Sequence, residues 1–206
     1  MSPKVPTIET PRLLLREWRD ADVEPWVKMN GDSRVMEFFP TSYTREQSQS
    51  MASTIRRGLE RLGYGWWAVQ ARDGPSFAGV ICLQEVPFQA HFTPAREIGW
   101  RLAFETWGKG YATEGARAAL DFAFRQLHWD RIVAMTAETN QRSQRVMERL
   151  GMRRNASDDF DHPRIEAGHR LRRHVLYRIS SQAYEQSELW KAGPPDQGEP
   201  RFRLMR

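Results

Sequence analysis

The stretch that most constrains the fold of this chain spans residues 105–124 and reads ETWGKGYATEGARAALDFAF. A Gly-Lys-Gly turn is followed by apolar residues at helical spacing, which predicts a long amphipathic helix that begins near Gly110. Strand-like runs precede the turn, at 95–104, and follow the helix, at 131–137. Because a strand, helix, strand succession usually forms a right-handed parallel crossover, these two strands are predicted to run parallel in one sheet.

The segments before this crossover predict two helices and an antiparallel part of the sheet. Residues 12–18 are apolar and predict a first strand, and an Asp-capped helix is predicted over 20–30. A second helix follows Thr44, a capping residue, and ends at Gly63. Two strand-like runs within 65–86 flank an Asp-Gly-Pro turn, which predicts an antiparallel hairpin.

The segments after the crossover predict a short helix and a closing pair of strands. Asn140 is a good helix N-cap, and Gly151 supplies the left-handed stop of the helix that follows it. Residues 152–156 and 174–180 predict the strand pair that completes the sheet.

Length and composition indicate one domain. A chain of 206 residues with 40% hydrophobic residues can bury one core. We expect a single domain over 1–185. Residues 186–206 contain Pro and Gly without periodicity, which predicts a loosely ordered C-terminal tail.

Charge and cysteine content narrow the classes of function. The net charge of +5 favours a polyanionic partner, and charge alone does not choose among nucleic acid, an acidic protein surface and a phosphate-rich cofactor. The 31 basic residues are interleaved with 26 acidic ones, as on an ordinary solvated surface, so direct nucleic-acid binding is not expected. The single cysteine, Cys82, excludes an internal disulfide and is interpreted as a small buried hydrophobic residue. No signal peptide or membrane span is evident, so a cytoplasmic protein without membrane contact is expected. No histidine pair has metal-ligand spacing, and no metal is predicted.

The Gly-Lys-Gly turn predicts an anion site at the start of the helix. Free backbone N–H groups and the helix dipole favour negative charge there. A Walker loop requires Ser or Thr after the lysine, whereas Gly110 follows Lys109. A dinucleotide fingerprint requires a third glycine where Thr113 stands. The loop therefore belongs to neither of these two phosphate-binding classes.

Residues 107–112, WGKGYA, resemble the pyrophosphate loop [RQ]-x-x-G-x-[GA] of the GNAT acetyltransferases, except that Trp107 takes the first place. Together with EIGWRLAFETWGKGYATEG, AETNQRSQRVMERLGM, IETPRLLLREW and HVLYRI, the chain resembles the branch that contains the RimJ and RimL ribosomal-protein acetyltransferases. The resemblance runs from about Ile8 to Ile179. It implies an α/β fold with a mixed, mostly antiparallel sheet, a central parallel pair of strands that splay apart, and flanking helices.

The resemblance implies acetyl-CoA as co-substrate. Its pantetheine would lie in the gap between strands 96–104 and 131–137, bonded to the backbone near Leu102 and Ala103. Its pyrophosphate would lie on the backbone of the loop and helix start, formed by Trp107, Gly108, Lys109, Gly110, Tyr111, Ala112 and Thr113. Asn140 and Ser143, which match an N-x-x-S pattern, would also meet the cofactor.

Two residues are candidates for catalysis. Glu97 stands where many members of the family carry a general base, although it could equally be a solvent-facing residue of an alternating strand. Many relatives use a tyrosine as the acid, but that place holds Met147, which cannot donate a proton. The resemblance then favours the Ser143 hydroxyl as the donor to the departing thiolate. The alternative is that Ser143 is a capping or solvated serine near the start of a helix.

Four other polar residues have two interpretations each. Arg142 and Arg145 could reach the ribose phosphate of the cofactor, or could be exposed residues of a helix. His162 and His174 lie in a segment that overhangs the acceptor side in this architecture, and surface or locally bonded histidines are the alternative.

The resemblance therefore implies an N-acetyltransferase that transfers acetyl from acetyl-CoA to a primary amine by direct attack in a ternary complex. The branch implies a protein N-terminus as acceptor, and a small-molecule amine remains open because fold does not fix substrate. A non-catalytic acyl-CoA-binding or regulatory module is the alternative, motivated by the missing tyrosine. An RNA-associated protein is a third interpretation of the basic charge. Both a monomer and a homodimer are compatible with the sequence.

Overall fold

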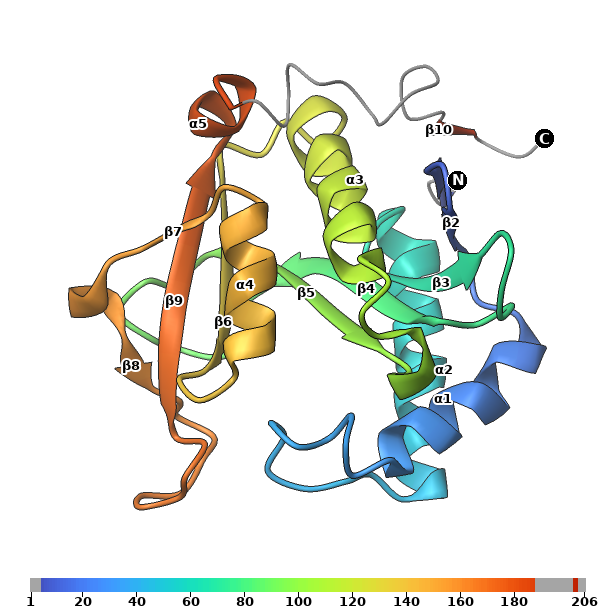
Figure 1. Ribbon diagram of the computed structural model, residues 1–206, viewed down its shortest axis with the longest axis horizontal. Coiled ribbons are helices and arrows are strands. Elements are labelled where there is room, and N and C mark those ends of the chain that lie inside the picture. Colours follow the sequence, from blue (N-terminus) through green and yellow to red (C-terminus); the bar gives the residue numbers. More distant parts are fainter. Residues whose placement is uncertain (1–4, 188–201, 204–206) are drawn as a thin grey trace.

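A single mixed sheet organises residues 5–187 and 202–203, the part of the chain described by this computed structural model (Figure 1). The strand order is β10-β1-β2-β3-β4-β5-β6-β9-β7, and β8 also pairs with β9. The strands are β1 (Thr7–Glu9), β2 (Leu13–Arg16), β3 (Trp66–Ala71), β4 (Gly79–Glu85), β5 (Arg96–Leu102), β6 (Arg131–Ala137), β7 (Arg153–Arg154), β8 (Phe160–Asp161), β9 (Arg173–Ser180) and β10 (Phe202–Arg203).

Helices begin and end where capping residues direct them. The Thr44 hydroxyl accepts from the Gln47 N–H, and the Gln47 side chain accepts from the Thr44 N–H in return, which fixes the start of the second helix. Gly63 ends it in the left-handed region, at φ 72°. The helices are α1 (Val23–Gly31), α2 (Arg45–Leu62), α3 (Tyr111–Arg125), α4 (Gln141–Arg149) and α5 (Ser181–Glu185), with 3-10 turns at Asp20–Asp22, Phe104–Thr106 and Ala156–Asp158.

The α3 helix covers one face of the sheet and α2 the other (Figure 1). The predicted apolar face of α3 is buried, including Ala116, Ala119 and Leu120. Gly115 permits a close approach, because a Cβ there would lie 2.2 Å from Cδ1 of Ile81 on β4. The helix is thereby held directly over the centre of the sheet.

The parallel pair at the centre of the sheet is joined at one register position only. Glu97 of β5 is opposite Val133 of β6, and no further pair of these two strands is hydrogen-bonded in the described residues. Strand β5 remains paired with β4 over its whole length, and β6 with β9. The two strands therefore splay apart toward the end of β5, as predicted.

Some elements were not predicted. The sequence gives weak local signals for β1 and β8, each of which is defined by its partner strand. Of the predicted tail, residues 188–201 and 204–206 lie outside the described residues, and 202–203 form β10 against β1. Within the described ranges, no helix is both long enough and apolar enough to cross a membrane.

Gly79→Ala should destabilise the fold where β4 meets the end of β5. Gly79 has φ 137°, and an added Cβ would lie 2.3 Å from the Arg101 carbonyl oxygen and 2.6 Å from Cα of Leu102. The expected loss is about 2 kcal/mol or more in free energy of unfolding, measured by denaturant titration. The control is Gly58→Ala in α2, where no neighbour lies within 4 Å. It should gain about 0.5–1 kcal/mol, and equal effects of the two changes would contradict this account.

Candidate active site

A cavity of about 1270 Å³ opens where β5 and β6 diverge. Its wall is formed by β5, the start of α3, the start of α4 and the segment between α1 and α2. The predicted site residues that line it are Glu97, Leu102, Trp107, Gly108, Lys109, Gly110, Tyr111, Ala112, Thr113, Asn140 and Ser143. Ala103 is not part of the wall.

The loop at the start of α3 has the conformation that an anion site requires. Gly108 and Gly110 adopt left-handed backbone angles, with φ 74° and 78°, and Gly110 is the N-cap of α3. The first N–H groups of a helix have no partner within the helix. The residues that carry them, Tyr111 to Thr113, line the cavity, so the positive end of the α3 dipole lies at its wall.

Arg12, which the sequence analysis did not identify, fixes the shape of this loop. Its Nε donates to Oε2 of Glu114 at 2.6 Å, and its Nη1 donates to the Lys109 carbonyl at 2.9 Å. Its guanidinium also lies over the Tyr111 ring, 5.2 Å from the centroid. The backbone of Lys109 is thus held, whereas its side chain is exposed.

The pairing of β5 determines which of its backbone groups face the gap. The Ala103 N–H donates to the Ala78 carbonyl at 2.9 Å, on the β4 side. Because backbone groups alternate along an antiparallel strand, those of Trp100 and Leu102 point away from β4, toward the gap. The Leu102 carbonyl accepts from the Trp107 indole at 2.8 Å. The predicted backbone contact therefore fits Leu102 and Trp100 better than Ala103.

Glu97 is half-buried at the point where β5 and β6 meet. Its carboxylate accepts a hydrogen bond from the Gln84 amide, and Gln84 accepts in turn from the Trp66 indole at 2.6 Å. Burial raises the pKa of Glu97, and the Gln84 hydrogen bond opposes this shift. Glu97 is therefore an oriented carboxylate of raised basicity, rather than a solvated residue on an alternating strand.

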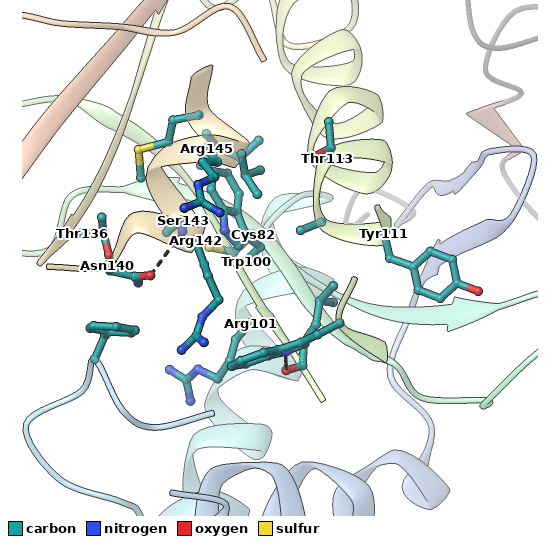
Figure 2. Close-up of a pocket in the computed structure, with 18 of the residues that line it drawn as sticks. Cys82, Trp100, Arg101, Tyr111, Thr113, Thr136, Asn140, Arg142, Ser143 and Arg145 are labelled. Atoms are coloured by element: carbon teal, nitrogen blue, oxygen red, sulfur yellow. Dashed lines mark hydrogen bonds between the residues drawn. The ribbon is translucent and has the colours of Figure 1, made fainter. Parts of the chain in front are cut away.

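Asn140 and Ser143 meet at the start of α4 (Figure 2). The Asn140 Oδ1 accepts from the Ser143 N–H at 3.2 Å, and its Nδ2 donates to Oγ1 of Thr136 at 2.9 Å. Asn140 is thus the N-cap that was predicted. Across the described residues, the Ser143 hydroxyl takes part in no hydrogen bond, and Ser143 lines the cavity. Met147 lies one turn further along α4 and is fully buried.

The segment between α1 and α2, which carried no motif, closes one side of the cavity. Glu37 on this segment pairs with Arg142 of α4, and its carbonyl accepts from Arg170 at 2.8 Å. The Arg142 guanidinium also lies 4.7 Å from the centroid of the Trp107 ring. Arg145 of α4 lines the cavity as well. The start of α4 thus brings two arginines to the cavity, of which Arg142 is paired with Glu37.

Two histidines and the cysteine complete the wall. His162 and His174 lie with ring centroids 4.9 Å apart. Burial, followed by the charges of His174 and Arg164, lowers the pKa of His162 to about 4, so it is neutral at physiological pH. Burial raises the pKa of the Cys82 thiol, in agreement with its interpretation as a buried hydrophobic residue.

Residues 5–187 and 202–203 contain no group of three or more His, Cys, Asp or Glu side chains that could hold a metal ion.

Comparisons with known proteins give a consistent result. Residues 12–153 match the model of a family described as an acetyltransferase (GNAT) domain. An uncharacterized N-acetyltransferase of Bacillus subtilis, YnaD, is 32% identical over 147 residues, which cover 71% of this chain and 82% of that protein. The structure of a GNAT-family acetyltransferase from Bacillus anthracis has a TM-score of 0.70 at 29% identity, covering 85% of this chain and 99% of that one.

A structure of Mycobacterium smegmatis RimJ in complex with CoA-disulfide also has a TM-score of 0.70. It covers 91% of both chains at 21% identity. At this identity the similarity shows the shared fold alone.

Gly110→Ala should weaken the binding of coenzyme A about tenfold or more, because a side chain at this N-cap displaces the amides expected to bind the pyrophosphate. Gly168→Ala is a matched control. Gly168 has a similar φ of 82° and open space around it, and it does not line the cavity. Both variants carry the same backbone strain, so titration calorimetry should show weaker binding for Gly110→Ala only. Equal losses would contradict a role of the loop in binding.

Proposed function

Because this chain belongs to the GNAT acetyltransferase family, and is accordingly an acetyl-CoA-dependent N-acetyltransferase, we propose that it acetylates a primary amine by direct attack in a ternary complex. The observation that carries this proposal is the continuity of one cavity. It joins the backbone amides of the Gly108–Gly110 loop, the gap beside β5, and the side chains of Glu97 and Ser143.

The residues present fit coenzyme A. The loop amides and the positive end of α3 suit a pyrophosphate, and Arg142 and Arg145 supply positive charge nearby. The backbone of Trp100 and Leu102 faces the gap, where it can pair with the amides of an extended pantetheine. When bound, acetyl-CoA supplies the thioester, whose carbonyl carbon gains the bond to nitrogen and loses the bond to sulfur.

Glu97 is proposed to accept the proton that the amine loses. The Trp66 and Gln84 hydrogen bonds hold its carboxylate in one orientation, and burial raises its basicity. An ordinary α-amino group has a pKa of about 8, so a fraction of the acceptor is already neutral near pH 7. The base therefore serves mainly to remove the proton after attack.

Ser143 is proposed to donate a hydrogen bond to the departing thiolate. Its N–H donates to Asn140, which fixes the Ser143 backbone at the cavity wall. A donor at the site of developing negative charge lowers the barrier. The buried Met147 cannot replace it in this role.

The resemblance and the sequence relatives bear on the class of acceptor. The RimJ and RimL resemblance of the sequence favours a protein N-terminus, whereas the relatives matched by sequence leave a small amine equally open.

The replacement of the usual tyrosine by Met147 favours, as a second candidate, a module that binds acyl-CoA without turnover. Thiol release from acetyl-CoA in the presence of amines and peptides separates the two, because a non-catalytic module binds acetyl-CoA and releases no thiol.

The pH dependence of turnover should report Glu97. Because its pKa is raised, Glu97 becomes protonated, and unable to accept a proton, at a higher pH than an ordinary glutamate. The value of kcat should therefore fall as pH decreases through this raised pKa. Glu97→Gln should lower kcat about 100-fold and remove this acidic limb, whereas Glu85→Gln, an exposed neighbour on β4, should keep both. A wild-type profile for Glu97→Gln would exclude it as the base.

Ser143→Ala should lower kcat about tenfold or more and leave the Kd of acetyl-CoA within about threefold, because the lost donor acts on developing charge. Ser143→Thr, which keeps the hydroxyl, should retain more activity. A thiol-release assay measures kcat, and titration calorimetry measures the Kd of acetyl-CoA. An unchanged kcat for Ser143→Ala would overturn the proposed role.

A further inference from the structure

Arg101 is a buried cation on the wall of the cavity (Figure 2). It lies on β5 and is only 7% exposed. Its Nη1 donates to Oδ1 of Asn30 at 2.6 Å, and its guanidinium lies 4.1 Å from the centroid of the Phe39 ring. The rings of Trp26 and Tyr43 lie at 5.3 and 5.9 Å. The side chain is thus held in one orientation by α1 and the segment that follows it.

No carboxylate of the described residues forms a salt bridge with Arg101. Its Nε is buried and has no hydrogen-bond partner. Burial lowers its pKa to about 10, and the groups that oppose this shift are the Tyr43 phenol and the Cys82 thiol. Arg101 therefore remains charged at neutral pH while buried without an anion, which is costly in a folded protein.

Arg16 shows how the same fold treats an arginine that serves only the structure. Arg16 is 3% exposed and binds both oxygens of Asp22, at 2.7 and 2.9 Å. It also donates to the Gln70 side chain and to the Ser76 carbonyl. Its charge and its donors are satisfied within the chain. The contrast indicates that the partner of Arg101 comes from outside the chain.

The position of Arg101 assigns this partner to the acceptor rather than to the phosphates of coenzyme A. Alternate residues of a strand face opposite sides of the sheet. Trp100 is opposite Ile81, which contacts α3, so Arg101 faces the other side, toward Asn30 of α1. Glu97, four residues earlier on β5, shares this side with Arg101. The phosphate loop begins α3, on the opposite side.

We propose that Arg101 binds the carboxylate of the acceptor, and that the acetylated substrate is a small amine that carries a carboxylate. This inference rests on the proposed acetyl transfer and deepens it. Arg101 lines the cavity, and its planar guanidinium carries donors suited to a carboxylate. Because Arg101 is only 7% exposed and its guanidinium lies beside the rings of Phe39 and Tyr43, a small acceptor can reach it more readily than a folded protein surface.

The test compares kcat/KM, from thiol release, for amino acids and for the corresponding amino acid carboxamides, which keep the amine and lack the carboxylate. The wild-type protein should prefer the carboxylates at least about tenfold. Arg101→Gln should lower kcat/KM for the carboxylates by a similar factor and leave that for the carboxamides unchanged, and Arg101→Lys should fall between. Arg61→Gln, which removes an exposed charge of α2, is the control and should change neither.

Thermal denaturation and acetyl-CoA titration show whether Arg101→Gln folds. If it does not fold, a second variant tests the inference. Asn30→Asp keeps the size of the side chain and places a carboxylate on the Arg101 guanidinium. It should abolish the preference for carboxylates. Acetylation of amines without any preference for carboxylates, or a preference kept in both variants, overturns the inference and leaves the proposed function intact. Binding of acetyl-CoA without acetylation of any amine overturns both.

Discussion

The single register position at which β5 and β6 pair is the constraint on which the rest of the structure depends. The two parallel strands pair at Glu97 and Val133 and then separate, while β4 and β9 keep each of them in the sheet. A sheet normally satisfies the backbone groups between neighbouring strands, so a gap in its centre leaves those of β5 available to an extended ligand. The cavity, the Glu97 carboxylate and the starts of α3 and α4 are all arranged around this gap.

Each end of the gap has a different chemical character. At the end of β5, the loop before α3 presents backbone amides, and the hydrogen bonds of Arg12 to Lys109 and Glu114 hold it in shape. Where the strands meet, Glu97 is oriented by side-chain hydrogen bonds and its pKa is raised by burial. The proposed phosphate site and the proposed proton acceptor are therefore separated along one strand, as transfer from a long cofactor to an amine requires.

The sequence predicted the elements whose signals are local. Caps such as Thr44 and Asn140, the stop at Gly151 and the apolar period of α3 determine backbone structure within a few residues. The splayed parallel pair and the phosphate loop followed from the order of elements and from family resemblance. Features made by distant residues could not be predicted: Arg12 and Glu114 are 102 positions apart, and Arg101 and Asn30 are 71 apart. No periodicity or motif reports such contacts, and the burial of Arg101 depends on aromatic residues from two other segments.

The central claim is that the gap beside β5 holds acetyl-CoA. Hydrogen–deuterium exchange, followed by mass spectrometry with and without acetyl-CoA, tests it most directly. The account predicts slower exchange at the backbone amides of residues 98–102 and 107–113 on binding, with little change in β9, which pairs with β6 on the far side. Saturable binding that protects other segments and leaves 98–102 and 107–113 unchanged would contradict the account.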